Sequence, residues 1–310
     1  MGVIEVRDLH KEYGAVTAVD GISFEVTEGE VFGFLGPNGA GKTTTIRTLL
    51  GFLSPTAGGA TVLGADATDE AALVEAKRSI GYLPSNPAFD DGVTGRRILD
   101  LHESIKGGSR RAELLESFEP PLDRPVREYS SGNKQKLGIV QAFMHDPDLA
   151  ILDEPTSGLD PLMQQRFNDY VRAERERGTA VFFSSHVLSE VRQVCDRVGI
   201  LRNGRLVTTE PIESLLERSG KFVRARIVGR PTADAFDGED VHDLERNVIE
   251  DTDGRLAGED AVVTEVQFTY TGDVNDLLGR LAPHQFVDLD IEEAPIEEVF
   301  MRFYGEGNDA

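Results

Sequence analysis

The sequence has a single cysteine, Cys195, and no long apolar run, and both absences narrow the kind of protein that it encodes. One cysteine cannot form an internal disulfide, and without a cluster of cysteines and histidines the chain offers no zinc site. No apolar stretch approaches the roughly 18 to 20 residues that span a bilayer. We therefore expect a protein of a reducing cytoplasm, with at most a peripheral role at a membrane.

Basic residues are also scarce, and lysine most of all. The chain has 32 Lys and Arg against 55 Asp and Glu, a formal charge of −23 at pH 7, so binding to a phosphate backbone would work against this field. Only 7 of the basic residues are lysine and 25 are arginine. This composition indicates a high-salt cytoplasm, such as that of a halophilic archaeon, where a Debye length of about 3 Å at 1 M screens the carboxylates. An ordinary acidic mesophilic protein is the alternative.

The length of 310 residues predicts one large domain and one smaller one, and a hydrophobic content of 39% is enough for packed cores. Antiparallel strands are expected within residues 3–26, after which short apolar strands alternate with helices, with a helical insertion at residues 94–118. Beyond about residue 219 the composition changes to a separate α+β unit. Its expected elements are strands at 222–228, 262–270 and 286–291 and an acidic loop around 238–258.

Residues 36–43 read Gly-Pro-Asn-Gly-Ala-Gly-Lys-Thr, which fits the phosphate-loop (Walker A) pattern G-x-x-x-x-G-K-T. An apolar strand at 31–35 precedes the loop and helical spacing follows it at 42–50. In such a unit backbone N–H groups turn toward the β- and γ-phosphates, Lys42 neutralises their charge, and Thr43 coordinates Mg²⁺. The predicted nucleotide-binding residues are Gly36, Pro37, Asn38, Gly39, Ala40, Gly41, Lys42, Thr43 and Thr44.

A second element of this chemistry is the apolar run Leu149 to Leu152, which ends in Asp153 and Glu154. Parallel α/β sheets place ligands at the carboxyl ends of their strands, so Asp153 is expected to hold Mg²⁺ and Glu154 to polarise the attacking water. Adjacent carboxylates after a strand can instead cap a loop. The phosphate loop upstream favours nucleotide hydrolysis.

Further motifs, in order along the chain, make it resemble the ATP-binding cassette (ABC) ATPases. Residues 129–136, YSSGNKQK, are similar to the signature sequence of that family, usually written LSGGQ. Residues 157–160, SGLD, resemble its D-loop, and residues 184–186, SSH, resemble the segment that carries its switch histidine. Tyr13 stands where the family has the aromatic residue of its A-loop. The resemblance covers residues 1 to about 218.

The resemblance implies a fold, an activity and partners. The fold would be α/β, a P-loop NTPase cassette of residues 1–218 with a RecA-like core, an antiparallel β subdomain and a helical subdomain at about 86–146, followed by a small α+β domain of residues 219–310. The activity would be hydrolysis of ATP with Mg²⁺ in a head-to-tail dimer of two copies. The implied roles are stacking on adenine for Tyr13, phosphate contact in trans for Ser130, Ser131 and Gly132, a D-loop role for Asp160, and catalysis for Glu154 and His186.

The sequence departs from the family pattern in two places. Ser85 stands at the Q-loop position, where a glutamine usually completes Mg²⁺ coordination and couples to the membrane partner. Serine has a shorter reach, so a bridging water or Asn86 would have to assist it. The signature has Ser131 for the first glycine and Asn133 for glutamine, while the residues expected to contact phosphate are kept. The expected Mg²⁺ ligands are Thr43, Asp153 and Ser85.

Two functions fit the resemblance. In the first, the chain is the ATPase of a transporter at the cytoplasmic face of the cell membrane, docked to integral membrane permease subunits through a groove between the Q-loop and the helical insertion. In the second, it is a soluble ABC ATPase acting on nucleic acid or the ribosome. The charge of −23, the single cassette and the absence of long heptad arms favour transport, with no nucleic acid partner.

The closing residues 294–300, APIEEVF, resemble the end of ATPases of ABC-2 type and drug-resistance exporters similar to those for daunorubicin, in which a small α+β domain follows the cassette. Ile296, Val299, Phe300 and Phe303 recur at helical spacing and are expected to pack a helix on a sheet. A regulatory role and a generic stabilising or dimerising role are the two alternatives for this unit.

Overall fold

The computed structural model describes residues 2–231, 236, 238–251 and 261–293, and the closing helix expected around Ile296 lies outside them. Contacts divide the chain into two units, Met1–Ile212 and Glu213–Ala310. The sequence predicted this boundary a few residues later, after residue 218. Each unit has a hydrophobic cluster of its own.

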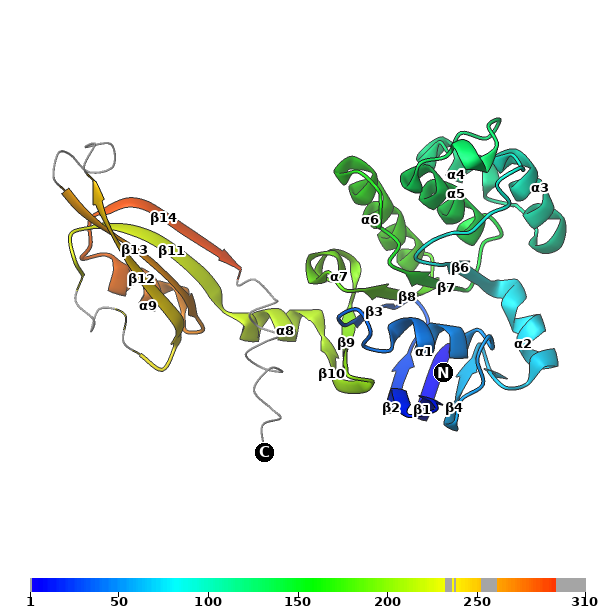
Figure 1. The fold of residues 1–310 in the computed structure, drawn as a ribbon, viewed down its shortest axis with the longest axis horizontal. Coiled ribbons are helices and arrows are strands. Elements are labelled where there is room, and N and C mark those ends of the chain that lie inside the picture. Colours follow the sequence, from blue (N-terminus) through cyan, green and yellow to red (C-terminus); the bar gives the residue numbers. More distant parts are fainter. Residues whose placement is uncertain (1, 232–235, 237, 252–260, 294–310) are drawn as a thin grey trace. The chain divides into compact units, whose positions relative to one another are not determined.

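The centre of the first unit is a six-stranded sheet in the order β10-β9-β3-β8-β7-β6 (Figure 1). Its strands are β3 (Val31–Leu35), β6 (Ile80–Leu83), β7 (Leu149–Asp153), β8 (Ala180–Ser185), β9 (Arg197–Arg202) and β10 (Arg205–Pro211). All neighbouring pairs are parallel except β9 and β10. Every residue of β3, β7 and β8 is buried, as expected for parallel strands that are covered on both faces.

A second sheet, in the order β2-β1-β4-β5, is antiparallel. It consists of β1 (Ile4–Tyr13), β2 (Val16–Val26), β4 (Ala57–Val62) and β5 (Ala65–Asp66). Helix α1 (Lys42–Leu49) contacts strands of both sheets, and its Ile46 and Leu49 are completely buried in the shared core. The helix that follows the phosphate loop is therefore held between the two sheets.

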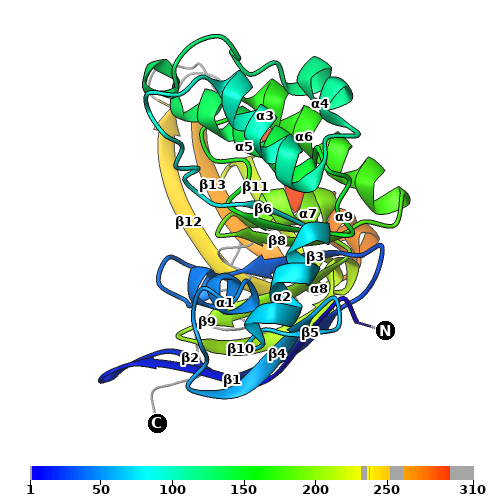
Figure 2. The ribbon, with the colours of Figure 1, turned by 90° about the vertical axis from the view of Figure 1, so that its right-hand side faces the viewer.

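Helices form the rest of the first unit, and Figure 2 shows α3, α4 and α5 grouped at one end of it. The helices are α2 (Glu70–Ala76), α3 (Gly95–Lys106), α4 (Arg111–Phe118), α5 (Ser131–Phe143), α6 (Pro161–Glu176) and α7 (Leu188–Val194), with short 3₁₀ turns at Lys77–Ser79 and Val126–Glu128. Asp69, Thr94, Ser130 and Asp160 cap α2, α3, α5 and α6, each accepting from the backbone N–H three residues later. Gly107, at a φ of 91°, ends α3.

The second unit contains most of α8 (Ile212–Ser219), an antiparallel sheet in the order β12-β13-β11-β14, and α9 (Val274–Leu281). The strands are β11 (Lys221–Val228), β12 (Val241–Asp251), β13 (Ala261–Tyr270) and β14 (Phe286–Glu293). Helix α9 leads from β13 to β14, and β11 lies between them, which is a split β-α-β arrangement. Leu277 and Leu281 of α9 pack in a core with Phe268 and Tyr270.

The prediction of an acidic loop around residues 238–258 is wrong for residues 241–251, which form β12. This strand lies at the edge of its sheet, and its pairing with β13 shifts between His242 and Glu245. Asp243, with a φ of 52°, lies in that irregularity. An edge strand with charged, exposed residues and a bulge has weak apolar alternation, so the sequence pattern did not indicate a strand.

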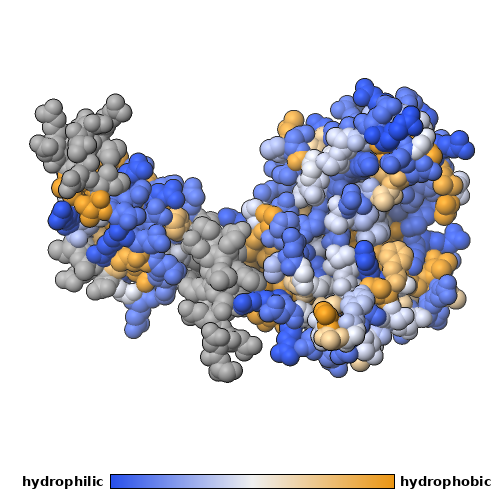
Figure 3. Space-filling model, in the orientation of Figure 1, coloured by the Kyte–Doolittle hydropathy of each residue, from blue (hydrophilic) through white to orange (hydrophobic). Residues whose placement is uncertain are grey.

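The visible face of the first unit is mainly hydrophilic, with small apolar groups among charged residues (Figure 3). Within the described residues, no helix combines the length and apolar character that crossing a membrane would require.

Candidate nucleotide-binding site

Residues 36–41 form a tight turn between β3 and α1, and glycine is required at two of its positions. A Cβ on Gly36 would lie 2.4 Å from the carbonyl oxygen of Leu201, and one on Gly41 would lie 2.4 Å from that of Ala18. Gly41 also has a φ of 110°, which other residues rarely adopt. Because α1 begins directly after this turn, the first N–H groups of the helix have no intrahelical partner and are available to an anion.

A cavity of about 370 Å³ opens beside this turn. It is lined by predicted residues from the phosphate loop, from the Q-loop position and from the ends of β7 and β8: Pro37, Asn38, Gly39, Gly41, Lys42, Thr43, Thr44, Ser85, Glu154 and His186. Ala18 and Ser157 also line it, and sequence reasoning did not assign either to the site. Five separate segments of the chain therefore meet at one cavity, at the carboxyl ends of parallel strands.

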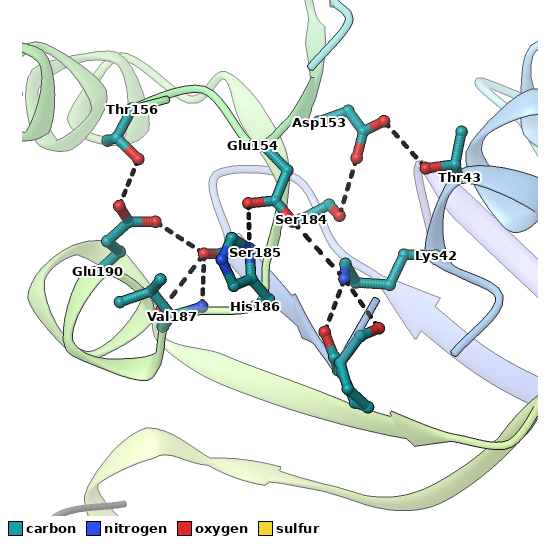
Figure 4. Close-up of polar contacts among 12 residues, drawn as sticks. Lys42, Thr43, Asp153, Glu154, Thr156, Ser184, Ser185, His186, Val187 and Glu190 are labelled. Carbon is teal, nitrogen blue, oxygen red and sulfur yellow. Dashed lines mark hydrogen bonds and ion pairs between the residues drawn. The ribbon is translucent and has the colours of Figure 1, made fainter. Parts of the chain in front are cut away.

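Glu154 lies between the two basic groups of the cavity (Figure 4). Its Oε1 is 3.5 Å from Lys42 Nζ, and its Oε2 is 2.6 Å from His186 Nδ1. Lys42 Nζ also donates to the carbonyl oxygens of Gly36, at 2.6 Å, and Pro37, at 3.2 Å. The ammonium group thus lies over the phosphate loop, and the carboxylate of Glu154 is held by partners on both sides.

The backbone at Glu154 is in the left-handed region, with a φ of 51°. Its N–H donates to the carbonyl oxygen of Ser184 at 2.9 Å, in continuation of the pairing between β7 and β8. A non-glycine residue in this conformation costs on the order of 1 kcal/mol and is common at functional sites. Here the conformation turns the chain out of the sheet while the side chain points into the cavity.

Asp153 is buried beneath Thr43, and these residues fit a magnesium site. Thr43 Oγ1 donates to Asp153 Oδ2 at 3.2 Å, and Ser184 Oγ donates to Asp153 Oδ1 at 3.1 Å. Hydroxyl and carboxylate oxygens are ligands that Mg²⁺ prefers, and two adjacent octahedral ligands at about 2.1 Å from it are about 3 Å apart. The separation of Thr43 Oγ1 and Asp153 Oδ2 therefore suits a shared cation.

The signature residues begin α5 and do not line the cavity of their own chain. Ser130 caps the helix by accepting from the N–H of Asn133 at 3.2 Å. Gly132 packs so closely on the D-loop that an added Cβ would lie 2.6 Å from the carbonyl oxygen of Gly158. Gln135, one turn further along, donates to the carbonyl oxygen of Pro155 at 2.8 Å. The start of α5 is thus packed against the segment that follows Glu154.

Asp160 and Tyr13 also lie outside the cavity lining, as do Gly36, Ala40 and Asp153 of the predicted set. Asp160 caps α6, accepting from the N–H of Met163 at 2.9 Å. Tyr13 ends β1 at the hairpin and is 48% exposed, with Lys11 Nζ 5.2 Å from its ring centroid. An exposed aromatic ring is available for stacking, and its assignment to adenine stays a prediction.

Sequence reasoning missed a group of residues that join the loops around the site. Glu190, in the first turn of α7, accepts from Thr156 Oγ1 at 2.6 Å and from Ser185 Oγ at 2.7 Å. Thr156 belongs to the loop after Glu154, and Ser185 directly precedes His186. The glutamate is in no recognised motif, and only the adjacency of β7 and β8 brings its partners together.

A second cavity, of about 270 Å³, lies on the other side of the Q-loop position. Its lining comprises Tyr82, Pro84, Pro87, Ala88, Phe89, His102, Lys106, Gly138, Gln141 and His145. Burial, together with the nearby Lys106, lowers the pKa of His102 and His145 to about 4, and burial lowers that of Lys106 to about 8. Lys106 Nζ donates to the carbonyl oxygen of Ile80 at 2.7 Å, and no described carboxylate pairs with it.

Comparison with known proteins gives consistent results. Residues 19–157 match the family model described as ABC transporter. The chain is 37% identical over 251 residues to the bacitracin transport ATP-binding protein BcrA of Bacillus licheniformis, covering 78% of this chain and 81% of the relative. It is 32% identical over 315 residues to the Nod factor export ATP-binding protein I of Rhizobium etli, covering 98% and 94%.

Solved structures confirm the expected α/β cassette fold. An ATP-binding subunit of an ABC transporter superposes with a TM-score of 0.64 and 32% identity, covering 69% of this chain and 91% of that one. A dimeric ATP-binding cassette in a post-hydrolysis state with ADP and Pi has a TM-score of 0.62, covering 67% of this chain and 98% of its own. At 21% identity, this second likeness concerns the fold alone.

Proposed function

The chain belongs to the ATP-binding proteins of ABC transporters and is an ATPase, and from this premise we propose that it drives export through separate membrane subunits. The observation that carries the catalytic part of the proposal is the position of Glu154. Its carboxylate lies at the end of β7, between Lys42 and His186, in a cavity beside the phosphate loop.

We assign the residues of this cavity the following roles. Lys42, Thr44 and the backbone of residues 36–43 bind the phosphates of ATP, and Thr43, Asp153 and Ser85 hold Mg²⁺, which supplies charge neutralisation on the phosphate oxygens when it is bound. Glu154 orients and deprotonates the attacking water. His186, 2.6 Å from Glu154, contacts the γ-phosphate and fixes the carboxylate.

Replacing Glu154 by Gln tests the catalytic assignment. The amide keeps the shape of the side chain but is not a base, so kcat should fall about 10²- to 10⁴-fold while ATP still binds. Glu176→Gln, on the exposed side of α6, is the matched control and should keep the wild-type rate. Wild-type turnover by Glu154→Gln would show that another group activates the water.

We also propose that two copies of the chain enclose ATP between them, with Ser130, Ser131 and Gly132 of one copy facing the phosphate loop of the other. Support comes from the start of α5, whose N–H groups and positive dipole end suit a phosphate and which lies outside the cavity of its own chain. MgATP should drive the Glu154→Gln protein from monomer to dimer in sedimentation velocity. A monomer under both conditions would count against this arrangement.

The partner in this proposal is an integral membrane permease of the ABC-2 exporter type, at the cytoplasmic face of the membrane. Relatives named for bacitracin transport and Nod factor export support an export role. We place the docking surface at the 270 Å³ groove and the adjoining α3, where Leu101 and Ile105 are 64% and 62% exposed. Two large apolar side chains one helical turn apart are typical of a binding surface rather than of a solvated face.

Co-purification with the permease encoded beside this chain tests the docking surface. Leu101→Asp should reduce recovery of the permease while isolated ATP binding and the melting temperature stay at wild-type values. Val74→Asp, at an apolar residue of α2 that is 57% exposed, is the control for adding a charge. Full recovery with folded Leu101→Asp would place the interface elsewhere, and failure of the wild type to bind the permease would favour the soluble-ATPase alternative.

The remaining part of the proposal concerns the environment of the protein. The charge of −23 and the excess of arginine over lysine support adaptation to high salt.

A further inference from the structure

The hydrogen bonds of Glu190 connect two loops that border the nucleotide cavity, and the function described so far does not use them (Figure 4). One carboxylate oxygen accepts from Thr156 Oγ1 at 2.6 Å and the other from Ser185 Oγ at 2.7 Å. Both donors are almost completely buried. Hydroxyl donors to a carboxylate form charge-assisted hydrogen bonds, which are about twice as strong as neutral ones.

Ser185 places one end of this connection directly before His186. Its backbone oxygen accepts from the N–H of Gly36 at 3.2 Å, at the start of the phosphate loop. Its Oγ accepts from the N–H of Val187 at 2.9 Å, on the far side of His186. The residues before and after His186 are thus held through one hydroxyl group, whose own proton goes to Glu190.

Thr156 places the other end directly before the D-loop, two residues after Glu154. The next residue, Ser157, lines the cavity, and Gly158 packs against Gly132 at the start of the signature helix. A change in the position of this loop would therefore alter both the cavity wall and the surface on which the start of the signature helix packs. The carboxylate of Glu190 is the described group that hydrogen-bonds both to this loop and to the segment that carries His186.

We propose that Glu190 is a positioning residue for ATP hydrolysis: it fixes the loop between Glu154 and the D-loop relative to the segment around His186, so that His186 and Glu154 keep the contact seen between them. This inference rests on the roles proposed above for Glu154 and His186. Glu190 itself touches neither the cavity nor, by this geometry, the nucleotide. Its effect is on the relative placement of two side chains that do.

Without Glu190, the buried hydroxyl of Thr156 loses its acceptor, and that of Ser185 keeps only the more distant carbonyl oxygen of Val187, at 3.3 Å. A buried polar group without a partner costs about 1 to 3 kcal/mol. Both loops would then rearrange to find other partners. A misplacement of about 1 Å in a catalytic group can cost about 10²-fold in rate. We therefore expect Glu190→Ala to lower kcat about 10- to 100-fold while KM for ATP changes less than about threefold, because the phosphate loop is intact.

The experiment is steady-state ATP hydrolysis by the full-length chain, with melting temperatures measured on the same preparations. Glu190→Gln should give an intermediate kcat, because the amide keeps one acceptor oxygen and presents an NH₂ donor to the second hydroxyl. The matched control is Glu30→Gln. Glu30 is also a buried carboxylate that accepts from a threonine hydroxyl, that of Thr27 at 2.8 Å, and it lies outside the cavity lining.

The two variants separate positioning from folding. Glu30→Gln should lower the melting temperature and leave kcat unchanged, since Arg197 loses its charged partner far from the chemistry. Glu190→Ala should lower kcat even if its melting temperature equals that of Glu30→Gln, with both variants folded at the assay temperature. A folded Glu190→Ala with wild-type kcat would overturn the proposal, and so would a loss of kcat that Glu30→Gln reproduces at equal destabilisation.

A double-variant series then identifies the hydroxyl groups that matter. Thr156→Val and Ser185→Ala should each lower kcat, and neither should add its full effect to Glu190→Ala, because the bond in question is already absent. Fully additive effects would contradict the shared network. Wild-type turnover by Glu154→Gln would refute the role of Glu154 as the base without changing the measured effect of Glu190→Ala. Failure of the proposed function and failure of the Glu190 proposal are therefore distinguishable.

Discussion

A buried ion pair attaches the helical part of the first unit to α6, and its removal has a calculable cost. Arg110, just before α4, places one guanidinium nitrogen 2.5 Å from Glu174 Oε2, and Glu174 is completely buried. The same guanidinium contacts Glu113 at 2.9 Å and Asp146 at 3.4 Å, and it lies 5.5 Å from the ring centroid of Tyr170. We predict that Arg110→Met strongly destabilises the first unit.

The magnitude follows from the burial of Glu174. Removing one partner of a buried pair leaves an uncompensated charge and costs about 3 to 5 kcal/mol. Arg177 Nε lies 3.9 Å from the other oxygen of Glu174, too far to replace the lost hydrogen bond. For a unit of about 200 residues each kcal/mol corresponds to roughly 2 to 4 °C, so the melting temperature should fall by about 6 to 20 °C.

Thermal unfolding followed by circular dichroism measures this effect in the full chain. MgATP stabilises only the unit that binds it, so the transition that the nucleotide shifts upward belongs to the first unit. The double variant Arg110→Met with Glu174→Leu should recover most of the loss, because well-packed apolar residues often replace a buried ion pair at little cost. A melting temperature for Arg110→Met within about 2 °C of wild type would refute the reasoning, as would a double variant no more stable than the single one.

Two further predictions concern salt and pH. Melting temperatures should be higher in 2 M than in 0.1 M KCl, because screening relieves repulsion among 55 carboxylates; equal or lower values at 2 M would return the chain to the ordinary acidic class. Burial, with Lys106 nearby, lowers the pKa of His102 and His145 to about 4, against about 6.5 in the unfolded chain. Between these values only the unfolded chain binds the protons, so this contribution to stability is complete above about pH 6.5 and is lost as the pH falls toward 4. Replacing both rings by Gln should flatten that pH dependence by a few kcal/mol, less than the full pKa shifts imply because solvent screens these partly exposed groups. Urea unfolding at pH 4.5 and 7.0 measures it, and an unchanged slope would contradict it.

The phosphate loop and the Asp153-Glu154 pair could be read from the sequence because each is a continuous segment with its structural context beside it. An apolar strand, a glycine turn and a helix follow one another within residues 31–49, so local pattern alone indicated the element. The steric reason for glycine at Gly36 and Gly41 is not local, since a Cβ there would meet the carbonyl oxygens of Leu201 and Ala18, which are distant in the sequence. Sequence reasoning succeeded where the chemistry is contiguous.

The Glu190 network could not be predicted in the same way. Its three members come from the loop after β7, the end of β8 and the first turn of α7, and Thr156 and Glu190 are 34 positions apart. Threonine, serine and glutamate are ordinary residues at such positions, so no spacing distinguishes them. The strand β12 was missed for a different reason, since its charged residues and bulge hide the alternation that indicates a strand.

Ser85, which stands in place of the usual Q-loop glutamine, lies in the loop between the nucleotide cavity and the groove assigned to the permease. Ser85 lines the nucleotide cavity, while Pro84 and Pro87, in the same short loop, line the groove assigned to the permease. The proline rings fix φ at two of its positions, which limits the conformational freedom of the loop between the two cavities. A long glutamine could reach Mg²⁺ from a distant backbone, whereas a serine can contribute only if the loop itself lies against the cavity, as it does here. In the proposed transporter, we therefore expect the position of the loop backbone, more than the extension of a side chain, to carry the coupling between the nucleotide and the permease.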